Sequence, residues 1–597
     1  MNLRKAPAIM NYNLNTPDGA ENKKQKVRFS SLKSLVGHMV EEKKTLLIAF
    51  IAMLVTAVLS LTGPMIIGYT IDHYVQTKQF HGVLVFSGIL LLMYIVALFS
   101  GYLRTRLMGS VGQRMLFTLR NAVFTKLQEL PYDFFNQNKA GDLISRINND
   151  TDKVNQFFSQ SLMQFLMSVL IMIGSGIFLL SINFRLGAAA LSPAILIWVF
   201  TKFVSPWVKK KNSESLKTTG FLSSEVQESL NNFKVIVAFN RRDYFRERFK
   251  KANRKNYSAS VKAGIANALF MPVYTILSNI GMLIVLTYGI YLISQGSFTI
   301  GFLISFIAYV TSFYNPLRQL ASLWASFQLA LAAWERIQKI LALESNMKRV
   351  SGGKKKETDS FLTFTDVTFT YPNGTKVLKR INFNLQRGKT YAFVGPTGGG
   401  KTTTASLISR LYDPTEGQVL LDGTDIRSYS EAERMKKIGF ILQDPFMFSG
   451  TIRDNILYGN EEYSGMDNNK LAGIFRESGL EKLLERFDNG LETRVDISEN
   501  GISLGQKQII AFMRAILRKP ELLILDEATA NIDTVTEQML DEIIQKLPES
   551  TTKVIIAHRL NTIANADVIY FVNTGEITRA GSLNDAIDML MHGNMAS

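Results

Sequence analysis

Residues 263–317 contain no Asp, Glu, Lys or Arg, and this absence limits what the chain can fold into more than any other feature. A helix that crosses the hydrocarbon core of a bilayer needs about 20 largely apolar residues, so the stretch is too long for one crossing. The cluster Ser294-Gln295-Gly296-Ser297 predicts a tight turn that divides it. We therefore expect two membrane spans here.

Four further apolar stretches precede this pair, at residues 45–71, 82–103, 154–184 and 186–201. The last is short, but Arg185 and Lys202 at its ends can extend their charged groups to the membrane surface. Six spans are therefore predicted. The proline residues Pro64 and Pro316 are expected to bend their helices or to act as hinges.

The net charge of +17 gathers in two long polar connections, between the second and third spans and between the fourth and fifth. Such basic loops are typical of the cytoplasmic side of a membrane protein, so we expect a lipid bilayer and no nucleic acid as partner. The N-terminal residues are polar and basic and lack the apolar core of a signal peptide, which favours a cytoplasmic N-terminus.

The sequence beyond about residue 320 mixes charged and apolar residues, as a soluble α/β domain does. The chain has no cysteine, which excludes disulfides, thiolate zinc sites and a cysteine nucleophile. We expect a multi-domain protein, with an all-α membrane domain followed by an α/β phosphate-loop domain. The predicted parts are an N-terminal extension (1–40), a six-helix membrane domain (41–345), a linker (346–358) and an ATP-binding domain (359–597).

A glycine-rich segment from Gly395 to Thr402 follows a strand-like run and precedes a helix-like run, which is the context of a phosphate loop. Its backbone N–H groups can surround a β-phosphate at a helix N-terminus. Lys401 can reach the β- and γ-phosphates, and the Thr402 hydroxyl can bind Mg²⁺. The candidate ATP-binding residues are Gly395, Thr397, Gly398, Gly399, Gly400, Lys401, Thr402 and Thr403.

Two further strands end in residues suited to ATP hydrolysis. The apolar run 522–525 precedes Asp526, a candidate to hold magnesium through water, and Glu527, a candidate general base. The run 554–557 precedes His558, which can sense the γ-phosphate. Together with Lys401, Glu527 and His558 are the predicted catalytic residues.

The order of these motifs resembles the nucleotide-binding domain of ATP-binding cassette (ABC) transporters. The motifs are Tyr371, the phosphate loop, Gln443, the segment Ile502-Ser503-Leu504-Gly505-Gln506, Asp526-Glu527, Asp533 and His558. A membrane domain that comes first, with six spans and two long loops, resembles the exporter class of this family. Residues 131–150 and 228–239 are similar to the two cytoplasmic loops of those exporters.

The resemblance implies a role for each matching residue. Tyr371 would stack on adenine, and Gln443 would contact Mg²⁺ together with Thr402 and Asp526. Residues 530–533 would form a loop that crosses to a partner domain. In this family two domains pair head to tail, so Ser503, Gly505 and Gln506 would meet the ATP held by the phosphate loop of a second half-transporter.

One departure from the family pattern concerns the signature segment, which normally reads Leu-Ser-Gly-Gly-Gln. Leu504 stands at the position of the first glycine, and residues 496–497 lack the usual Gly-Glu. A leucine side chain there should hinder the approach of a γ-phosphate to backbone N–H groups. The phosphate loop and Glu527 are intact, so the chain resembles the degenerate-signature subunit of heterodimeric bacterial multidrug-type exporters; a homodimer stays open.

The expected function is ATP-driven export of a small amphipathic or lipophilic substrate by an ABC-type translocating ATPase, with ATP and Mg²⁺ as cofactors. The expected location is a bacterial inner (plasma) membrane, with the N-terminus and the ATP-binding domain in the cytoplasm. Abundant aromatic residues in the spans also permit a lipid flippase or a peptide exporter. The remaining alternative is a regulatory or sensing subunit with little net transport.

Overall fold

The computed structural model describes residues 12–14, 42–347, 349–350, 355, 357, 359–496, 502–526, 534–556, 563 and 565–592. The chain forms two compact units. The helical unit comprises the described parts of Gly19–Gln128 and Gly141–Ala342. The α/β unit comprises those of Met1–Asp18, Glu129–Ala140 and Leu343–Ser597. Glu129–Ala140, which follows the second span, therefore belongs to the α/β unit, although the residues on either side of it belong to the helical unit.

The helical unit contains six helical segments long and apolar enough to cross a membrane, which confirms the six predicted spans. Their main helices are α2 (Lys43–Thr70), α3 (Phe80–Gln128), α7 (Leu162–Ile182), α8 (Phe184–Asn231), α10 (Arg242–Ala268), α11 (Phe270–Ser294) and α12 (Ile300–Leu341). Shorter pieces complete it: η2 (Ile71–Val75), α5 (Ala140–Ser145), η3 (Arg146–Asp150), α6 (Thr151–Gln156), η4 (Phe157–Ser161) and α9 (Phe233–Ala238).

The predicted turn between the last two spans is present, since α11 ends at Ser294 and Gly296 has a φ of 69°. One boundary differs from prediction. The third span was expected to reach residue 184, but α7 ends at Ile182 because Asn183 caps the next helix, its side chain accepting a hydrogen bond from the Leu186 N–H at 3.0 Å. Helix α8 contains the fourth predicted apolar stretch and continues as a polar helix far beyond residue 201.

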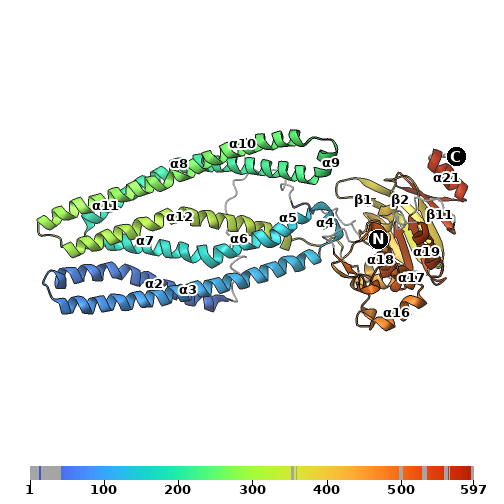
Figure 1. The fold of residues 1–597 in the computed structure, drawn as a ribbon, viewed down its shortest axis with the longest axis horizontal. Helices are drawn as coiled ribbons and strands as arrows, with labels where there is room; N and C mark the ends of the chain where they lie inside the picture. The colour runs from blue at the N-terminus through green and yellow to red at the C-terminus, as the bar shows by residue number, and fades with distance from the viewer. Residues whose placement is uncertain are drawn as a thin grey trace, which may run out of the picture. The chain divides into compact units, whose positions relative to one another are not determined.

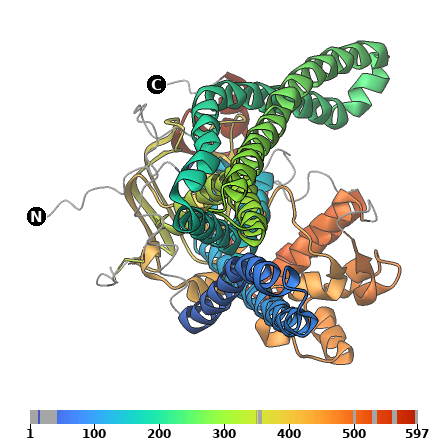
Figure 2. The ribbon, with the colours of Figure 1, turned by 90° about the vertical axis from the view of Figure 1, so that its left-hand side faces the viewer.

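The long helices pack in neighbouring pairs, and both ribbon views show α8 and α10 side by side (Figure 1, Figure 2). Helix α12 packs against α7, α2 and α11, and its Tyr309 and Tyr314 are buried among apolar side chains. Many other apolar side chains point outward, including Leu91 and Leu98 of α3. An apolar surface of this extent requires a lipid environment.

Helices α2 and α12 approach closely where two glycines meet. A Cβ atom on Gly301 would lie 2.0 Å from the Gly68 carbonyl oxygen, so neither position has room for a side chain. Ser305 donates a hydrogen bond to the Pro64 carbonyl at 2.7 Å, and the Asp72 carboxylate accepts one from the Gly301 N–H at 2.8 Å. Small residues and polar bonds between helices are the usual means of helix association in lipid.

The α/β unit contains two main sheets. One is antiparallel, in the order β2 (Lys376–Leu385), β1 (Leu362–Thr370), β4 (Glu416–Leu421) and β5 (Thr424–Asp425). The other has the order β12 (Glu576–Ala580), β11 (Val568–Asn573), β3 (Thr390–Val394), β10 (Thr552–Ile556), β9 (Leu522–Asp526) and β6 (Ile438–Ile441). All its strands are parallel except β12. Strands β7 (Gly450–Thr451) and β8 (Arg494–Val495) form a small third pair.

The helices of this unit surround the sheets. They are α4 (Tyr132–Gln137), α13 (Lys401–Ile408), α14 (Glu431–Lys437), α15 (Ile452–Leu457), α16 (Asn468–Glu477), α17 (Glu481–Leu484), α18 (Leu504–Leu517), α19 (Thr534–Gln545) and α21 (Leu583–His592). Single turns are η5 (Ile426–Ser428), η6 (Glu461–Tyr463) and η7 (Gly490–Glu492). The α/β architecture predicted for this part of the chain is therefore confirmed.

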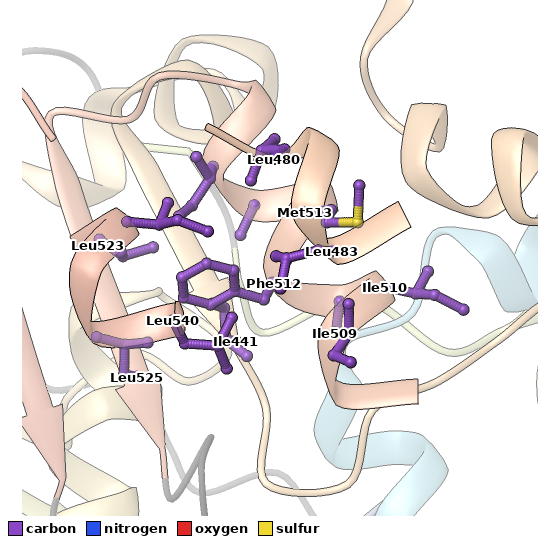
Figure 3. Packing of buried hydrophobic residues seen from close by; sticks show 14 of the residues in the cluster. Ile441, Leu480, Leu483, Ile509, Ile510, Phe512, Met513, Leu523, Leu525 and Leu540 are labelled. Atoms are coloured by element: carbon purple, nitrogen blue, oxygen red, sulfur yellow. The ribbon is translucent and has the colours of Figure 1, made fainter. Parts of the chain in front are cut away.

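Helix α18 is held in place by its buried face. Figure 3 shows Ile509, Phe512 and Met513 of this helix in the same apolar cluster as Leu525 of β9 and Leu540 of α19. Their spacing of three and four residues places them on one side of the helix. Because this face is buried, the start of the helix is also fixed relative to the sheet.

Candidate active site

The parallel sheet places several candidate residues at one edge. Strands β3, β10, β9 and β6 are neighbours in that order, so their carboxyl ends meet at the same edge. Gly395 follows β3, Asp526 ends β9, and Gln443 lies two residues after β6. Gly395, Gln443 and Asp526 thus lie at the same edge of the sheet, where ligands bind in α/β folds of this kind.

The segment between β3 and α13 has a backbone that only glycine adopts easily. Gly395 has a φ of 148°, Gly398 of 81° and Gly400 of 115°. A Cβ atom on Gly395 would lie 2.0 Å from the Val572 carbonyl oxygen. The glycines therefore allow the chain to turn sharply into the N-terminus of α13, where the N–H groups of a first helical turn can bind an anion.

Lys401 is buried at this helix start. Its Nζ donates hydrogen bonds to the Gly395 carbonyl at 2.7 Å and the Pro396 carbonyl at 3.1 Å. A cation held beside a helix N-terminus, whose dipole is also positive, forms a strongly anion-attracting position. The loop and its lysine are thus suited to phosphate groups.

Two oxygen donors lie next to this loop. The Thr402 hydroxyl donates to the Asp526 carboxylate at 3.4 Å, and Asp526 is almost completely buried. Hydroxyl and carboxylate oxygens are ligands that Mg²⁺ accepts, usually together with several waters. These residues fit a magnesium ion that accompanies a nucleotide.

Tyr371 directly follows β1 and lies beside the phosphate loop. Its hydroxyl forms a 3.1 Å hydrogen bond with the hydroxyl of Thr403 in α13. Its ring packs edge-on against Phe369, at 4.9 Å between centroids, and against Tyr412, at 5.6 Å. The bond to Thr403 fixes the position of Tyr371 relative to the start of α13.

Tyr412 connects this aromatic group to α4. The Asn136 side chain donates a 2.7 Å hydrogen bond to the Tyr412 hydroxyl, and the Tyr132 ring packs against the Tyr412 ring at 6.0 Å. Burial raises the pKa of Tyr412 to about 12, so its hydroxyl stays neutral. Sequence reasoning missed Tyr412, because its contact with Asn136 joins positions 276 residues apart and no local pattern indicates it.

The signature segment lies at the start of α18. Ser503 caps this helix by accepting a hydrogen bond from the Gln506 N–H, while the Gln506 side chain accepts one from the Ser503 N–H. Leu504 is the first residue of the helix, and 43% of its surface is exposed. Gly505 follows it. The leucine side chain thus stands in solvent at the helix end where a phosphate would approach.

The structure therefore brings Tyr371, Lys401, Thr402, Thr403 and Asp526 together around one loop. Ser503 and Gln506 hydrogen-bond to each other, and the Gln506 side chain also donates to the Arg486 carbonyl at 3.2 Å. Glu527, His558, residues 530–533 and most of the linker lie outside the described residues.

Comparison with known proteins agrees with both units. Residues 46–317 match the ABC transporter transmembrane region, and residues 378–530 match the ABC transporter domain. The chain is 34% identical over 573 residues to the ABC transporter ATP-binding protein YfiC of Bacillus subtilis, with 96% of this chain and 94% of YfiC covered. The chain belongs to the ABC transporter family.

Two further relatives are named for the molecules on which they act. A fatty acid ABC transporter ATP-binding/permease protein of Mycobacterium bovis is 32% identical, with 82% of this chain and 77% of the relative covered. An ATP-dependent lipid A-core flippase of Syntrophus aciditrophicus is 31% identical, with 83% and 82% covered. This ABC transporter chain is accordingly an ATP-binding, ATP-hydrolysing, multi-pass membrane protein of the exporter type.

Proposed function

We propose that this chain is one half of a dimeric exporter that uses ATP to move an amphipathic or lipophilic substrate across a membrane, and that the other half is a different chain. The observation that carries the proposal is the contact of α4 with Tyr412, next to Tyr371 and the phosphate loop. Helix α4 lies in the loop between α3 and α5. A change at the nucleotide can therefore reach the membrane helices through one short connection.

The chemistry proposed for the site uses residues in stated roles. Lys401 and the N–H groups at the start of α13 bind the phosphates, and Tyr371 stacks on the adenine. Thr402, Asp526 and Gln443 would hold Mg²⁺, which neutralises charge on the transferred phosphoryl group. Glu527 orients and deprotonates the attacking water, and His558 contacts the γ-phosphate.

A second loop supports a dimer. Helix α9 has exposed apolar side chains, with 56% of Phe233 and 74% of the neighbouring Phe239 accessible. Aromatic side chains exposed in a cytoplasmic loop are usually covered by a partner. We propose that the nucleotide-binding domain of the second half-transporter covers these side chains, since exporters of this family work as dimers.

The choice of a heterodimer depends on Leu504. Its exposed side chain occupies the helix start that would face the ATP on the partner's phosphate loop. That ATP would be bound but poorly hydrolysed, whereas the ATP on this chain's own loop would have Glu527. A partner with an orthodox signature would complete the site at this chain's own phosphate loop. A weakened general base in that partner would fit the poor hydrolysis expected at the other site.

The nature of the cargo is inferred from the spans. They are uncharged over long stretches and rich in aromatic residues, which suits an amphipathic molecule better than an ion. The relatives named for fatty acids and lipid A-core act on lipid-like molecules. The basic loops support a cytoplasmic position of the α/β unit, and we assign the protein to a bacterial inner membrane.

Reconstitution in vesicles tests this proposal. The chain alone, and the chain co-expressed with a neighbouring half-transporter gene, would be assayed for ATP-dependent uptake of fluorescent lipids and dyes. We expect uptake only from the pair, and we expect Glu527→Gln to remove most ATP turnover while nucleotide binding remains. Brisk turnover at two sites by a stable dimer of this chain alone would contradict the heterodimer.

The second candidate is a regulatory subunit, and the same exposed Leu504 favours it, because a poorly hydrolysing site can serve as a sensor. The vesicle assay separates the two functions. A sensor would change the ATP turnover of its partner without uptake of any substrate. An exporter would couple turnover to uptake.

A further inference from the structure

Tyr12, near the start of the chain, is almost completely buried in the α/β unit, with 1% of its surface exposed. Its hydroxyl donates a hydrogen bond to the Glu344 carbonyl at 3.0 Å and accepts one from the Asn346 N–H at 2.8 Å. Its ring packs edge-on against Phe134 of α4, with 6.2 Å between centroids. The apolar ring is therefore packed and the polar hydroxyl is hydrogen-bonded, as in a ligand bound in a pocket.

The backbone beside Tyr12 is bound as well. The Tyr12 N–H donates to the Gln137 side chain at 2.9 Å. The buried Asn138 side chain donates to the Tyr12 carbonyl at 2.9 Å and accepts from the Leu14 N–H at 3.0 Å. One amide thus satisfies two backbone groups of the segment, as a neighbouring strand would.

The two walls of this slot come from distant parts of the chain. Phe134, Gln137 and Asn138 belong to the loop that follows α3, whereas residues 344–346 come shortly after the end of α12 at Leu341. These are two of the places where the chain passes between its units. Residues 12–14 therefore contact two connecting segments, the one after α3 and the one after α12, that are far apart in sequence.

We propose that Phe134, Gln137, Asn138 and residues 344–346 form a binding slot for an extended, tyrosine-bearing peptide, and that residues 12–14 of the same chain are its ligand. The bound segment acts as a clasp between α4 and the connection after α12. With the clasp in place, both connections move together when the nucleotide site changes. Only this last consequence rests on the proposed export function.

Docking can be measured without any transport assay. The chain has no cysteine, so Asn13→Cys and Lys139→Cys introduce a single reactive pair at two exposed positions, one between Tyr12 and Leu14 and the other next to Asn138. A short bismaleimide should join them in the full-length protein in membranes. Adding Tyr12→Ala should lower the cross-linked fraction at least several-fold, and an unchanged fraction would overturn the slot.

Peptide rescue tests ligand identity. A chain lacking residues 1–18 would be mixed with a fluorescent peptide of residues 8–18, and with the same peptide carrying Tyr12→Ala. We expect saturable binding of the first peptide and at least tenfold weaker binding of the second. Equal binding of both peptides, or binding of neither, would overturn the proposal.

The clasp is then tested for coupling in the vesicle assay, with Tyr12→Ala and Tyr12→Phe. Loss of the whole side chain should raise the ATP consumed per substrate moved several-fold, and loss of the hydroxyl alone should raise it less. Unchanged ratios in both variants would refute the coupling role. Absence of uptake in the wild type would count against the export function, whereas the cross-linking result would still decide the slot.

Discussion

Asn136 of α4 donates a 2.7 Å hydrogen bond to the hydroxyl of Tyr412, whose ring packs against Tyr371 at the phosphate loop. A residue of the first loop is thereby attached to the residue expected to stack on adenine. Tyr412 stands between the two residues. Burial raises the pKa of its hydroxyl to about 12, so the hydroxyl is neutral. This contact joins the surroundings of the phosphate loop to α4, which lies between α3 and α5 in the chain.

The first prediction concerns this link. Tyr412→Phe removes the hydrogen bond to Asn136 but keeps the ring, which should weaken the attachment of α4 by about 1 kcal/mol. We expect more ATP consumed per substrate transported. Tyr391→Phe is the matched control, because the Tyr391 hydroxyl accepts a hydrogen bond from the Gln386 N–H inside the same unit. Equal transport ratios in the two variants would argue against the link.

The second prediction concerns phosphate binding. Lys401→Ala removes the cation at the start of α13, and a charge-assisted hydrogen bond contributes about 1.5–3 kcal/mol, so ATP affinity should fall roughly 10- to 150-fold. Equilibrium binding of a fluorescent ATP analogue measures the change. The exposed Lys389, which precedes β3, provides the control Lys389→Ala. If both variants bind like the wild type, Lys401 does not hold the phosphates.

The third prediction concerns the helix start at Leu504. Leu504→Gly should free the backbone N–H groups for a γ-phosphate and increase ATP turnover of the complete transporter, although glycine in a helix costs up to about 1 kcal/mol of stability. Leu504→Met keeps the bulk and should leave turnover unchanged. Steady-state phosphate release measures both. A glycine variant with wild-type turnover and normal thermal stability would contradict the steric account.

The fourth prediction concerns pH. Burial raises the pKa of Asp133 in α4, although the hydrogen bond from Gln137 opposes this. The stability that Asp133 contributes is therefore fully present below its unfolded pKa, about 3.9, and is lost as pH rises through its higher folded pKa. Asp133→Asn should consequently melt at a higher temperature than the wild type at pH 7. The difference should shrink toward pH 4, and a constant difference would contradict the assignment.

The fifth prediction concerns the contact of α2 with α12. Gly301→Ala places a methyl group where only 2.0 Å separates it from the Gly68 carbonyl, so the helices must move apart and the melting temperature should fall. Gly88→Ala in α3 is the control, because an added Cβ there meets no atom within 4 Å. Thermal melts in detergent or nanodiscs measure both. Equal melting temperatures would indicate that the close approach is not needed for stability.

The amino-acid sequence by itself determined the six spans, the phosphate loop and the strand β3 that leads into it. These features depend on local composition and spacing, because a span needs only sufficient apolar length and a phosphate loop needs glycines directly before a helix. The turn at Gly296 was predicted for the same reason. The boundary near Asn183 was missed by two residues, because a single side-chain cap decides it.

Only the tertiary structure decided what surrounds these features. The contact of Tyr412 with Asn136, the burial of Tyr12 between α4 and residues 344–346, and the close approach of Gly68 to Gly301 each join segments far apart in the chain. Such contacts depend on how whole elements pack, and one sequence carries no periodic signal for them. The residues of the phosphate-loop pattern are therefore readable from sequence, whereas the contacts that join that loop to α4 are set by packing.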